Sequence, residues 1–271
     1  MPDGKSIQSG TSHNLGQHFA EAFDITFEDE NAEERTCYTT SWGMSTRLIG
    51  ALIMAHGDND GLRLPPSIAP EQVVIVPIHQ GDNREEVVGY AEEVAEELED
   101  NFRVKIDDRE HKTPGFKFNH WEMKGVPLRL EIGPNEMEDG KVTAVRRDNG
   151  EQEAISLNNV DEKVGETLED IQESLYKELE DYQQENIRKA DSKNEILATI
   201  GKSRGYVKTK WCGQEDCESE IKDEVSAEIV VLPFDEGSEP ESIQEENDHI
   251  DGECAVCGEE AKRWAYFAKN Y

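Results

Sequence analysis

Apolar residues recur along the whole chain at spacings that predict helices and strands. From residue 48 to 55 they run unbroken except for Gly50, and predict a buried helix over about 45–56 with Arg47 in its first turn. The run VVIV at 73–76 suits a strand buried on both faces. Valine, alanine and leucine then follow at helical spacing through 84–100, so a helix is expected after that strand.

Three later segments alternate between apolar and polar residues, as half-buried strands do. They are FRVKIDD at 102–108, VPLRLEIG at 126–133 and KVTAVRRD at 141–148. The order strand, helix, strand and further strands predicts a mixed α/β sheet. A helical stripe within 165–192, with glutamate outside it, predicts a connector that packs by one face. The strand-like runs GYVKTKW and EIVVLP come after it.

The first 40 residues predict a short strand at Ile7 and Gln8, then a helix from about Asn14 through Phe23. The Thr-Ser-His segment at 11–13 would cap that helix. A hairpin is expected around the acidic turn DENAEE, with its second strand leading into TTSWGM.

Glycine, aspartate and proline gather in HGDNDGLRLPPSIAP, residues 56–70, and mark a domain boundary. With the change of pattern near the long helical stripe, this predicts three domains. Their expected bounds are 1–68, 69–165 and 166–271.

Acidic residues outnumber basic ones by 61 to 28, which gives a net charge of -33. The periodic apolar segments argue against disorder, so the excess of carboxylates indicates a halophile, whose surface holds water and cations at high salt. No apolar stretch is long enough to span a membrane, and the N-terminus lacks a secretory pattern. We therefore expect a cytoplasmic protein.

Four of the five cysteines form two close pairs, which in a cytosolic protein favours a metal site over disulfides. Cys212 and Cys217 are the first pair, and Cys254 and Cys257 are the second. Four thiolates in a tetrahedron would hold a structural zinc ion, as in a zinc ribbon. Spacing alone leaves open that the four are buried or loosely paired cysteines.

The stretch TTSWGMSTRLIG combines a strand, a glycine turn and a helix N-terminus, a combination that suits an anion. Read from the pattern alone, it is also compatible with a core helix and a snorkelling arginine. TTSWGMSTRLIGALIMAHGD followed by GLRLPPSIAPEQVVIVPI resembles motif 3 and the exit from the catalytic domain of a class II aminoacyl-tRNA synthetase. The similarity is to prolyl-tRNA synthetases of the archaeal and eukaryotic type and covers nearly the whole chain.

The resemblance implies an α/β fold in three parts: the C-terminal part of an antiparallel-sheet catalytic domain, a mixed α/β anticodon-binding domain and a small α+β zinc-binding domain. It implies that the complete enzyme forms prolyl-adenylate from proline and ATP with Mg²⁺, and transfers proline to tRNA(Pro). A homodimer is implied as well. Because the family's motifs 1 and 2 precede the matched region, we expect a C-terminal portion of such an enzyme.

The resemblance also assigns residues in the first part of the chain. Arg47 would bind ATP, because a guanidinium always carries charge and can fork two phosphate oxygens. Trp42 and Gly43 would shape the proline and adenylate pocket, and Thr11 and His13 would help to line it. By physics alone His13 is equally an ordinary surface histidine.

FKFNHWEMKGVPLRLEIGP resembles the family's anticodon-reading segment. Reading guanine in a single-stranded loop needs acceptors for N1–H and N2–H and donors for O6 and N7. A basic island from residue 105 to 129 contrasts with the acidity elsewhere, although any one of its charges could simply be solvated. The expected contacts are Lys117, Trp121, Glu122, Glu131 and Arg146, with Phe116 as a further ring for stacking.

Two other functions stay open from the sequence. A non-catalytic tRNA-binding module would explain the lack of motif 2, and an acidic zinc-ribbon interaction protein would need no resemblance at all. The terminal Tyr271 would fold back toward the catalytic site by resemblance, or fray as an ordinary chain end.

Overall fold

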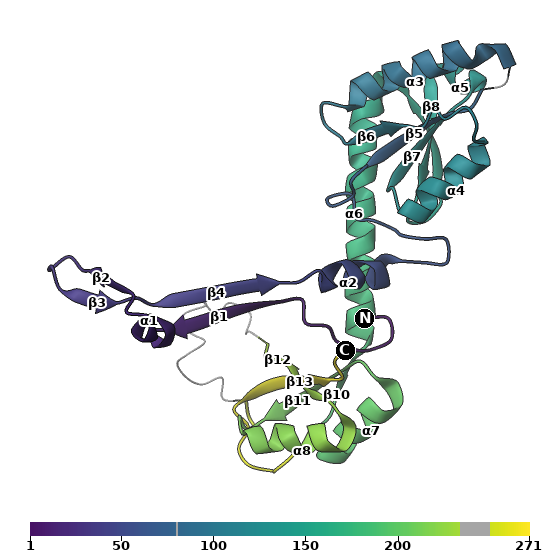
Figure 1. The fold of residues 1–271 in the computed structure, drawn as a ribbon. Coiled ribbons are helices and arrows are strands. Elements are labelled where there is room, and N and C mark those ends of the chain that lie inside the picture. The colour runs from purple at the N-terminus through teal and green to yellow at the C-terminus, as the bar shows by residue number, and fades with distance from the viewer. Residues whose placement is uncertain (80, 234–249) are drawn as a thin grey trace. The chain divides into compact units, whose positions relative to one another are not determined.

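The computed structural model describes residues 1–79, 81–233 and 250–271. The chain forms two compact units, one of Met1–Leu52 with Glu185–Tyr271 and one of Ile53–Gln184. Figure 1 shows the elements of both. The predicted bounds of three domains remain a prediction.

The unit Ile53–Gln184 is built on a five-stranded sheet of order β6-β5-β7-β8-β9. Its central strand β5 pairs in parallel with β6 and β7, while β8 and β9 continue the sheet antiparallel. The predicted strands are all present, and β9 is an addition that the sequence pattern did not predict. The strands are β5 Val73–Pro77, β6 Val104–Ile106, β7 Leu128–Ile132, β8 Lys141–Arg146 and β9 Gln152–Ser156.

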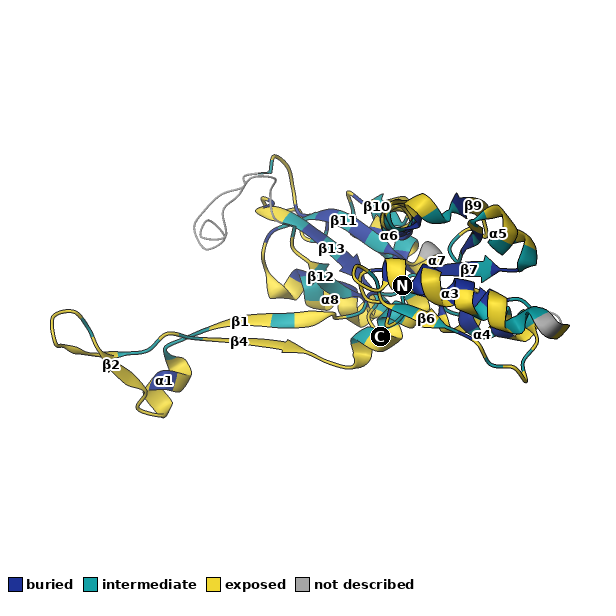
Figure 2. Cartoon of the chain, turned by 90° about the horizontal axis from the view of Figure 1, so that it is seen from above, coloured by how far each residue is buried: buried dark blue, intermediate teal, exposed yellow. Residues whose placement is uncertain are grey.

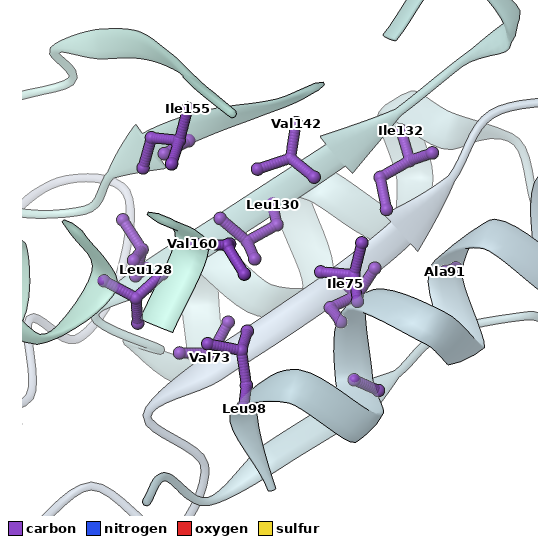
Figure 3. Close-up of a cluster of buried hydrophobic side chains, with 14 of the residues drawn as sticks. Val73, Ile75, Ala91, Leu98, Leu128, Leu130, Ile132, Val142, Ile155 and Val160 are labelled. Carbon is purple, nitrogen blue, oxygen red and sulfur yellow. The ribbon is translucent and has the colours of Figure 1, made fainter. Parts of the chain in front are cut away.

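Helices cover both faces of this sheet, which is why every residue of β5 is buried. On one face lie α3 (Arg84–Leu98) and the first turns of α6 (Val160–Glu185), and Figure 3 shows the core that they share with the strands. On the other face α4 (Pro114–Lys124) packs Trp121 against Val74 and Val76. Short helices occupy connections: η1 Gly81–Asn83, α5 Pro134–Asp139 and η2 Leu157–Asn159.

The loop that leads into this unit is fastened to the end of α4. The Leu62 N–H donates to Met123 O at 3.2 Å and the Leu64 N–H to Gly125 O at 3.1 Å. Gly125 ends α4 with φ 76°, and a Cβ there would lie 2.6 Å from Leu62 Cβ. A Cβ at Gly61 would in turn collide with the backbone of Met123. Each glycine thus lets the other segment approach.

The C-terminal part of the other unit is a four-stranded sheet of order β10-β11-β13-β12. Helices α7 (Lys193–Ser203) and α8 (Glu215–Val225) pack on one of its faces, where Val207 and Phe267 are fully buried. The predicted strand GYVKTKW is present, while the two helices were not predicted. The strands are β10 Ile187–Lys189, β11 Tyr206–Trp211, β12 Glu228–Val231 and β13 Arg263–Ala268.

The N-terminal part of this unit corrects two predictions. Residues 11–13 do not cap a helix, because they lie within strand β1 (Gly10–Gly16), which pairs antiparallel with β4 (Thr39–Met44). The helix is only α1, His18–Ala22. The predicted hairpin around DENAEE is present as β2 (Thr26–Glu28) and β3 (Glu34–Thr36).

Helix α2 (Arg47–His56) has Arg47 in its first turn, as predicted, but only His56 at its end is buried. Ile49 is 62% exposed and Ile53 is 47% exposed, so its apolar stripe faces solvent. Figure 2 shows the same exposure along β1, β2 and β4. Apolar periodicity predicted the helix correctly, whereas burial depends on a second surface that packs against the stripe.

Residues near the two chain ends lie side by side. Ser6 forms a β-bridge with Asn270, and the Tyr271 N–H donates to Ser6 O at 3.3 Å. Lys5 Nζ lies 4.7 Å from the centre of the Tyr271 ring. The strand predicted at Ile7 and Gln8 is reduced to this single bridge. Across the described chain, every helix is too short or too polar to cross a membrane.

Candidate functional sites

Four cysteine sulfurs converge at one end of the four-stranded sheet. Cys212 directly follows β11 and Cys217 lies in the first turn of α8, while Cys254 and Cys257 lie in the turn before β13. All four Sγ atoms lie within 4.8 Å of one another, and Cys212 Sγ is 3.6 Å from the Sγ atoms of both Cys217 and Cys257. The two cysteine pairs are about 40 residues apart in sequence, and the pairing of β11 with β13 brings them together.

This cluster fits a zinc ion. Zn–S bonds of about 2.3 Å in a tetrahedron place sulfurs about 3.8 Å apart, close to the observed spacing. Burial raises the pKa of Cys254, but backbone N–H groups of Cys257 and Val256 point at its sulfur and bring that pKa down to about 7. Cys257 is the exposed member of the set. Four protein ligands leave no open position, so such an ion would be structural.

The predicted pocket residues of the N-terminal part meet across the β1–β4 ladder. Thr11 lies opposite Gly43, Ser12 opposite Trp42, and His13 opposite Ser41. A Cβ at Gly43 would come within 3.2 Å of Thr11 Oγ1, so glycine keeps that hydroxyl accessible. Thr11 and His13 share one face of the ladder, whereas Trp42, 77% exposed, stands on the other.

Arg47 is the first residue of α2, directly after the turn that ends β4. Its backbone N–H donates to Ser45 Oγ at 3.4 Å, and its side chain is exposed. Among the residues that the structure describes, no carboxylate pairs with its guanidinium. A charged group with free donors at a helix N-terminus can bind an anion.

A second group of predicted residues lines a groove on the α4 side of the five-stranded sheet. The groove holds about 520 Å³ and is lined by Trp121, Glu122, Arg129, Arg146 and Arg147, among others. Glu131 adjoins it through Arg129, while Lys117 lies elsewhere. Acceptors and donors therefore face one hollow from α4, β7 and β8.

Ion pairs hold the groove's arginines in place. Arg129 donates to Glu122 Oε1 and to Glu131 Oε1, both at 2.9 Å, and its guanidinium lies 4.3 Å from the centre of the Phe118 ring. Arg146 forks Asp148 at 3.0 and 2.8 Å. Because these arginines are paired with carboxylates, the groove presents oriented hydrogen-bond donors and acceptors without a strong electrostatic potential of either sign.

Arg147 and Asp58 form another pair that the sequence did not single out as a site. The guanidinium forks the carboxylate at 2.7 and 2.8 Å, and this contact is the main reason why the pKa of Asp58 falls to about 2. The only sequence signal was the position of Arg147 beside Arg146. Asp58 lies in the loop taken as a domain boundary, 89 residues away in the chain.

Two of the predicted contacts are interior. Lys117 is 2% exposed and its Nζ donates to Asp107 O at 2.8 Å; Trp121 is 6% exposed and its Nε1 donates to Asp107 Oδ2 at 2.8 Å. Asp107 also receives the fork of Arg109 at 2.6 and 2.7 Å. In this structure Lys117 and Trp121 therefore support the loop after β6.

The exposed side of α4 carries a ring flanked by cations. Phe116 is 46% exposed and stacks on His120, with ring centres 6.1 Å apart. Lys112 Nζ lies 4.2 Å from the Phe116 ring centre, and the Arg109 guanidinium lies 5.9 Å from it. Aromatic rings among cations are a common surface for nucleotides.

Comparison with known families assigns the two folded regions. The anticodon binding domain family matches residues 72–167, and the family described as prolyl-tRNA synthetase, C-terminal, matches residues 193–271. The first match contains the groove except for Asp58 and Asp60, and the second contains the four cysteines.

Curated relatives match over the whole chain. A proline–tRNA ligase of Natronomonas pharaonis is 53% identical and one of Haloarcula marismortui is 52% identical, each over 100% of this chain and 54% of the relative. A proline–tRNA ligase of Alkaliphilus oremlandii is 46% identical with the same coverage. The chain thus spans about half the length of these relatives. The first two organisms are halophilic archaea, which fits the origin predicted from the acidic composition.

Proposed function

Because the chain belongs to the prolyl-tRNA synthetase family, we propose that it provides the tRNA-reading half of a proline–tRNA ligase together with part of the adenylate site. The reaction joins proline to ATP, releases pyrophosphate, and then transfers the prolyl group from AMP to tRNA(Pro). The work is done in the cytoplasm by a homodimer of the complete enzyme.

The observation that supports the catalytic part is the register of β1 with β4. It brings Thr11, Gly43 and Trp42 within one two-stranded ladder whose end leads directly to Arg47. Arg47 neutralises and orients ATP, which arrives with Mg²⁺. Thr11, His13 and Gly43, on one face of the ladder, line the proline and adenylate pocket, and Trp42 shapes it from the other face. Attack by the proline carboxylate needs positioning and charge neutralisation more than a protein nucleophile.

The groove beneath α4 reads the anticodon. The carboxylates of Glu122 and Glu131 accept hydrogen bonds from guanine N1–H and N2–H, and Arg146 donates to O6 or N7. Trp121 and Lys117 support the groove indirectly, because their hydrogen bonds to Asp107 hold α4 against the loop after β6. The four cysteines hold a structural zinc ion that keeps the C-terminal domain folded.

The test is proline-dependent exchange of pyrophosphate into ATP at high KCl. It is measured with this chain alone and with the chain fused to the part of the Natronomonas pharaonis relative that it does not span. We expect activity only in the fusion, and we expect Arg47→Ala to lower it by at least about a hundredfold. Arg35→Ala is the matched control, since Arg35 is an exposed arginine paired with Asp29 and Glu33.

Equal exchange by the Arg47→Ala and Arg35→Ala fusions would refute the role of Arg47. Retained binding of tRNA(Pro) with no exchange in any fusion would instead favour a second function, a non-catalytic tRNA-binding module. The match of residues 72–167 to the anticodon binding domain family favours this alternative, because reading an anticodon does not require an adenylate site.

A further inference from the structure

The face of the four-stranded sheet opposite α7 and α8 carries an ordered row of rings and lysines. Tyr206, Lys208 and Lys210 alternate along β11 with the core residues Val207 and Thr209. The cross-strand partners of the two lysines on β13 are aromatic: Lys208 lies opposite Tyr266 and Lys210 opposite Trp264. We call this set, with Lys189 of β10 opposite Lys208, the open face.

The side chains of the open face contact one another. Lys208 Nζ lies 5.0 Å from the Trp264 ring centre and 5.6 Å from that of Tyr266, while Lys210 Nζ lies 5.8 Å from Trp264. Tyr206 and Tyr266 meet edge to face, with centres 6.3 Å apart. A lysine thus faces a ring at two successive cross-strand pairs, and each of the three rings contacts a neighbouring side chain of the set.

The lysines of the open face keep their positive charge available. In the part of the chain that the structure describes, no carboxylate pairs with Lys189, Lys208 or Lys210, although the chain has 61 acidic residues. Lys210 Nζ donates to the backbone oxygen of Asp251, at 2.6 Å. Glu228, on the edge strand β12, forms an ion pair with Lys222 at 2.8 Å and accepts a hydrogen bond from Asn270.

From this we infer that the open face binds single-stranded RNA, independently of the groove in the other unit. Phosphates attract unpaired lysines even on an acidic molecule, and every base has a flat face that stacks on a ring, here the partly exposed rings of Tyr206, Trp264 and Tyr266. A four-stranded sheet with helices behind it and rings in front is a known platform for unpaired bases, whereas a duplex keeps its bases stacked and out of reach.

The test uses the full chain and a fluorescent oligouridylate of about 12 nucleotides, titrated over KCl concentrations at which the chain stays folded. We expect Lys189→Gln/Lys208→Gln/Lys210→Gln to raise Kd at least about tenfold. We also expect it to reduce the slope of log K against log salt by about 2, since each phosphate contact on a single strand contributes about 0.7. The matched control is Lys141→Gln/Lys163→Gln/Lys177→Gln, three lysines paired with carboxylates elsewhere.

Two further measurements separate binding from folding and locate the RNA. The Lys→Arg version of the open-face triple keeps the charge and should retain the affinity of the original chain. Ultraviolet cross-linking followed by peptide mapping should place uridine on Trp264 or Tyr266. Equal Kd and slope for the two Gln triples would overturn the inference, and so would cross-links confined to residues 72–167.

Discussion

The five-stranded and the four-stranded sheets reach a folded state by different means. Among the described residues, nineteen buried ones form one core around β5, β7, α3 and α6, whereas nine form the core of the four-stranded sheet. A small core yields little stability by itself. The four cysteines lie beside that smaller core, near the ends of β11 and β13, so a metal ion bound there would take over part of what apolar burial does in the larger sheet.

Loss of the metal ion should produce the largest difference in stability between the four-stranded and the five-stranded sheet. Cys254→Ser takes away one of four thiolates, and structural zinc in small domains is worth about 10–16 kcal/mol at pH 7. We expect the amides of β11 and β13 to lose protection from hydrogen exchange while those of β5 and β7 keep it. Zinc content measured by absorption spectrometry should fall from one ion per chain to none; full zinc content in Cys254→Ser would contradict the ligand assignment.

A cavity in the larger core should destabilise the five-stranded sheet and leave the four-stranded sheet intact. Leu130 is fully buried in β7, between α3 and α6. Leu130→Ala should destabilise its own sheet by about 3 kcal/mol, measured by native-state hydrogen exchange, and leave the zinc content unchanged. Ile49→Ala on the exposed side of α2 is the comparison, with an expected change below about 0.5 kcal/mol. Similar losses at both positions would show that α2 is packed in solution.

Acid should weaken the larger sheet through Asp107, whose carboxylate is 1% exposed. Burial raises the pKa of Asp107, but the hydrogen bonds from Arg109 and Trp121 outweigh burial and hold that pKa at about 2. A lowered pKa stabilises the fold above the ordinary value near 3.8, and this stabilisation is lost as pH falls through 2. At pH 7, Asp107→Asn should therefore cost about 2 kcal/mol.

The pH profile of this variant is the measurement that decides. The difference in unfolding free energy between the original chain and Asp107→Asn should shrink between pH 4 and pH 2. Glu166→Gln breaks an exposed pair with Lys163 and serves as the control, with no measurable change expected. A constant difference at all pH values would mean that the lowered pKa of Asp107 is not the cause.

Elements held by local pattern could be predicted from the sequence. The strand 73–76, the helix after it and the three alternating strands are all present because each shows its own periodicity. The four cysteines could be grouped as well, since their chemistry leaves few alternatives. Resemblance then identified the family, which relatives of 52–53% identity confirm.

Features that depend on distant partners could not be predicted. Residues 11–13 carry helix-capping chemistry, yet pairing with β4 about 30 residues later makes them a strand. Lys117 has the charge of a surface residue, and only the turn of α4 toward Asp107 shows that it is interior. The pair of Arg147 with Asp58 joins residues with no shared pattern. The roles of Thr11, His13, Trp42, Gly43 and Arg47 remain predictions.

The contact between the loop at Leu62 and the end of α4 constrains how this sequence can vary. Gly61 and Gly125 each stand where the other segment's backbone passes, and both have positive φ. A side chain at either position would force the two segments apart and break the hydrogen bonds from Leu62 and Leu64. Substitution at one glycine cannot be compensated at the other, so we expect both to be lost only together with the loop itself, by deletion or replacement of the whole segment.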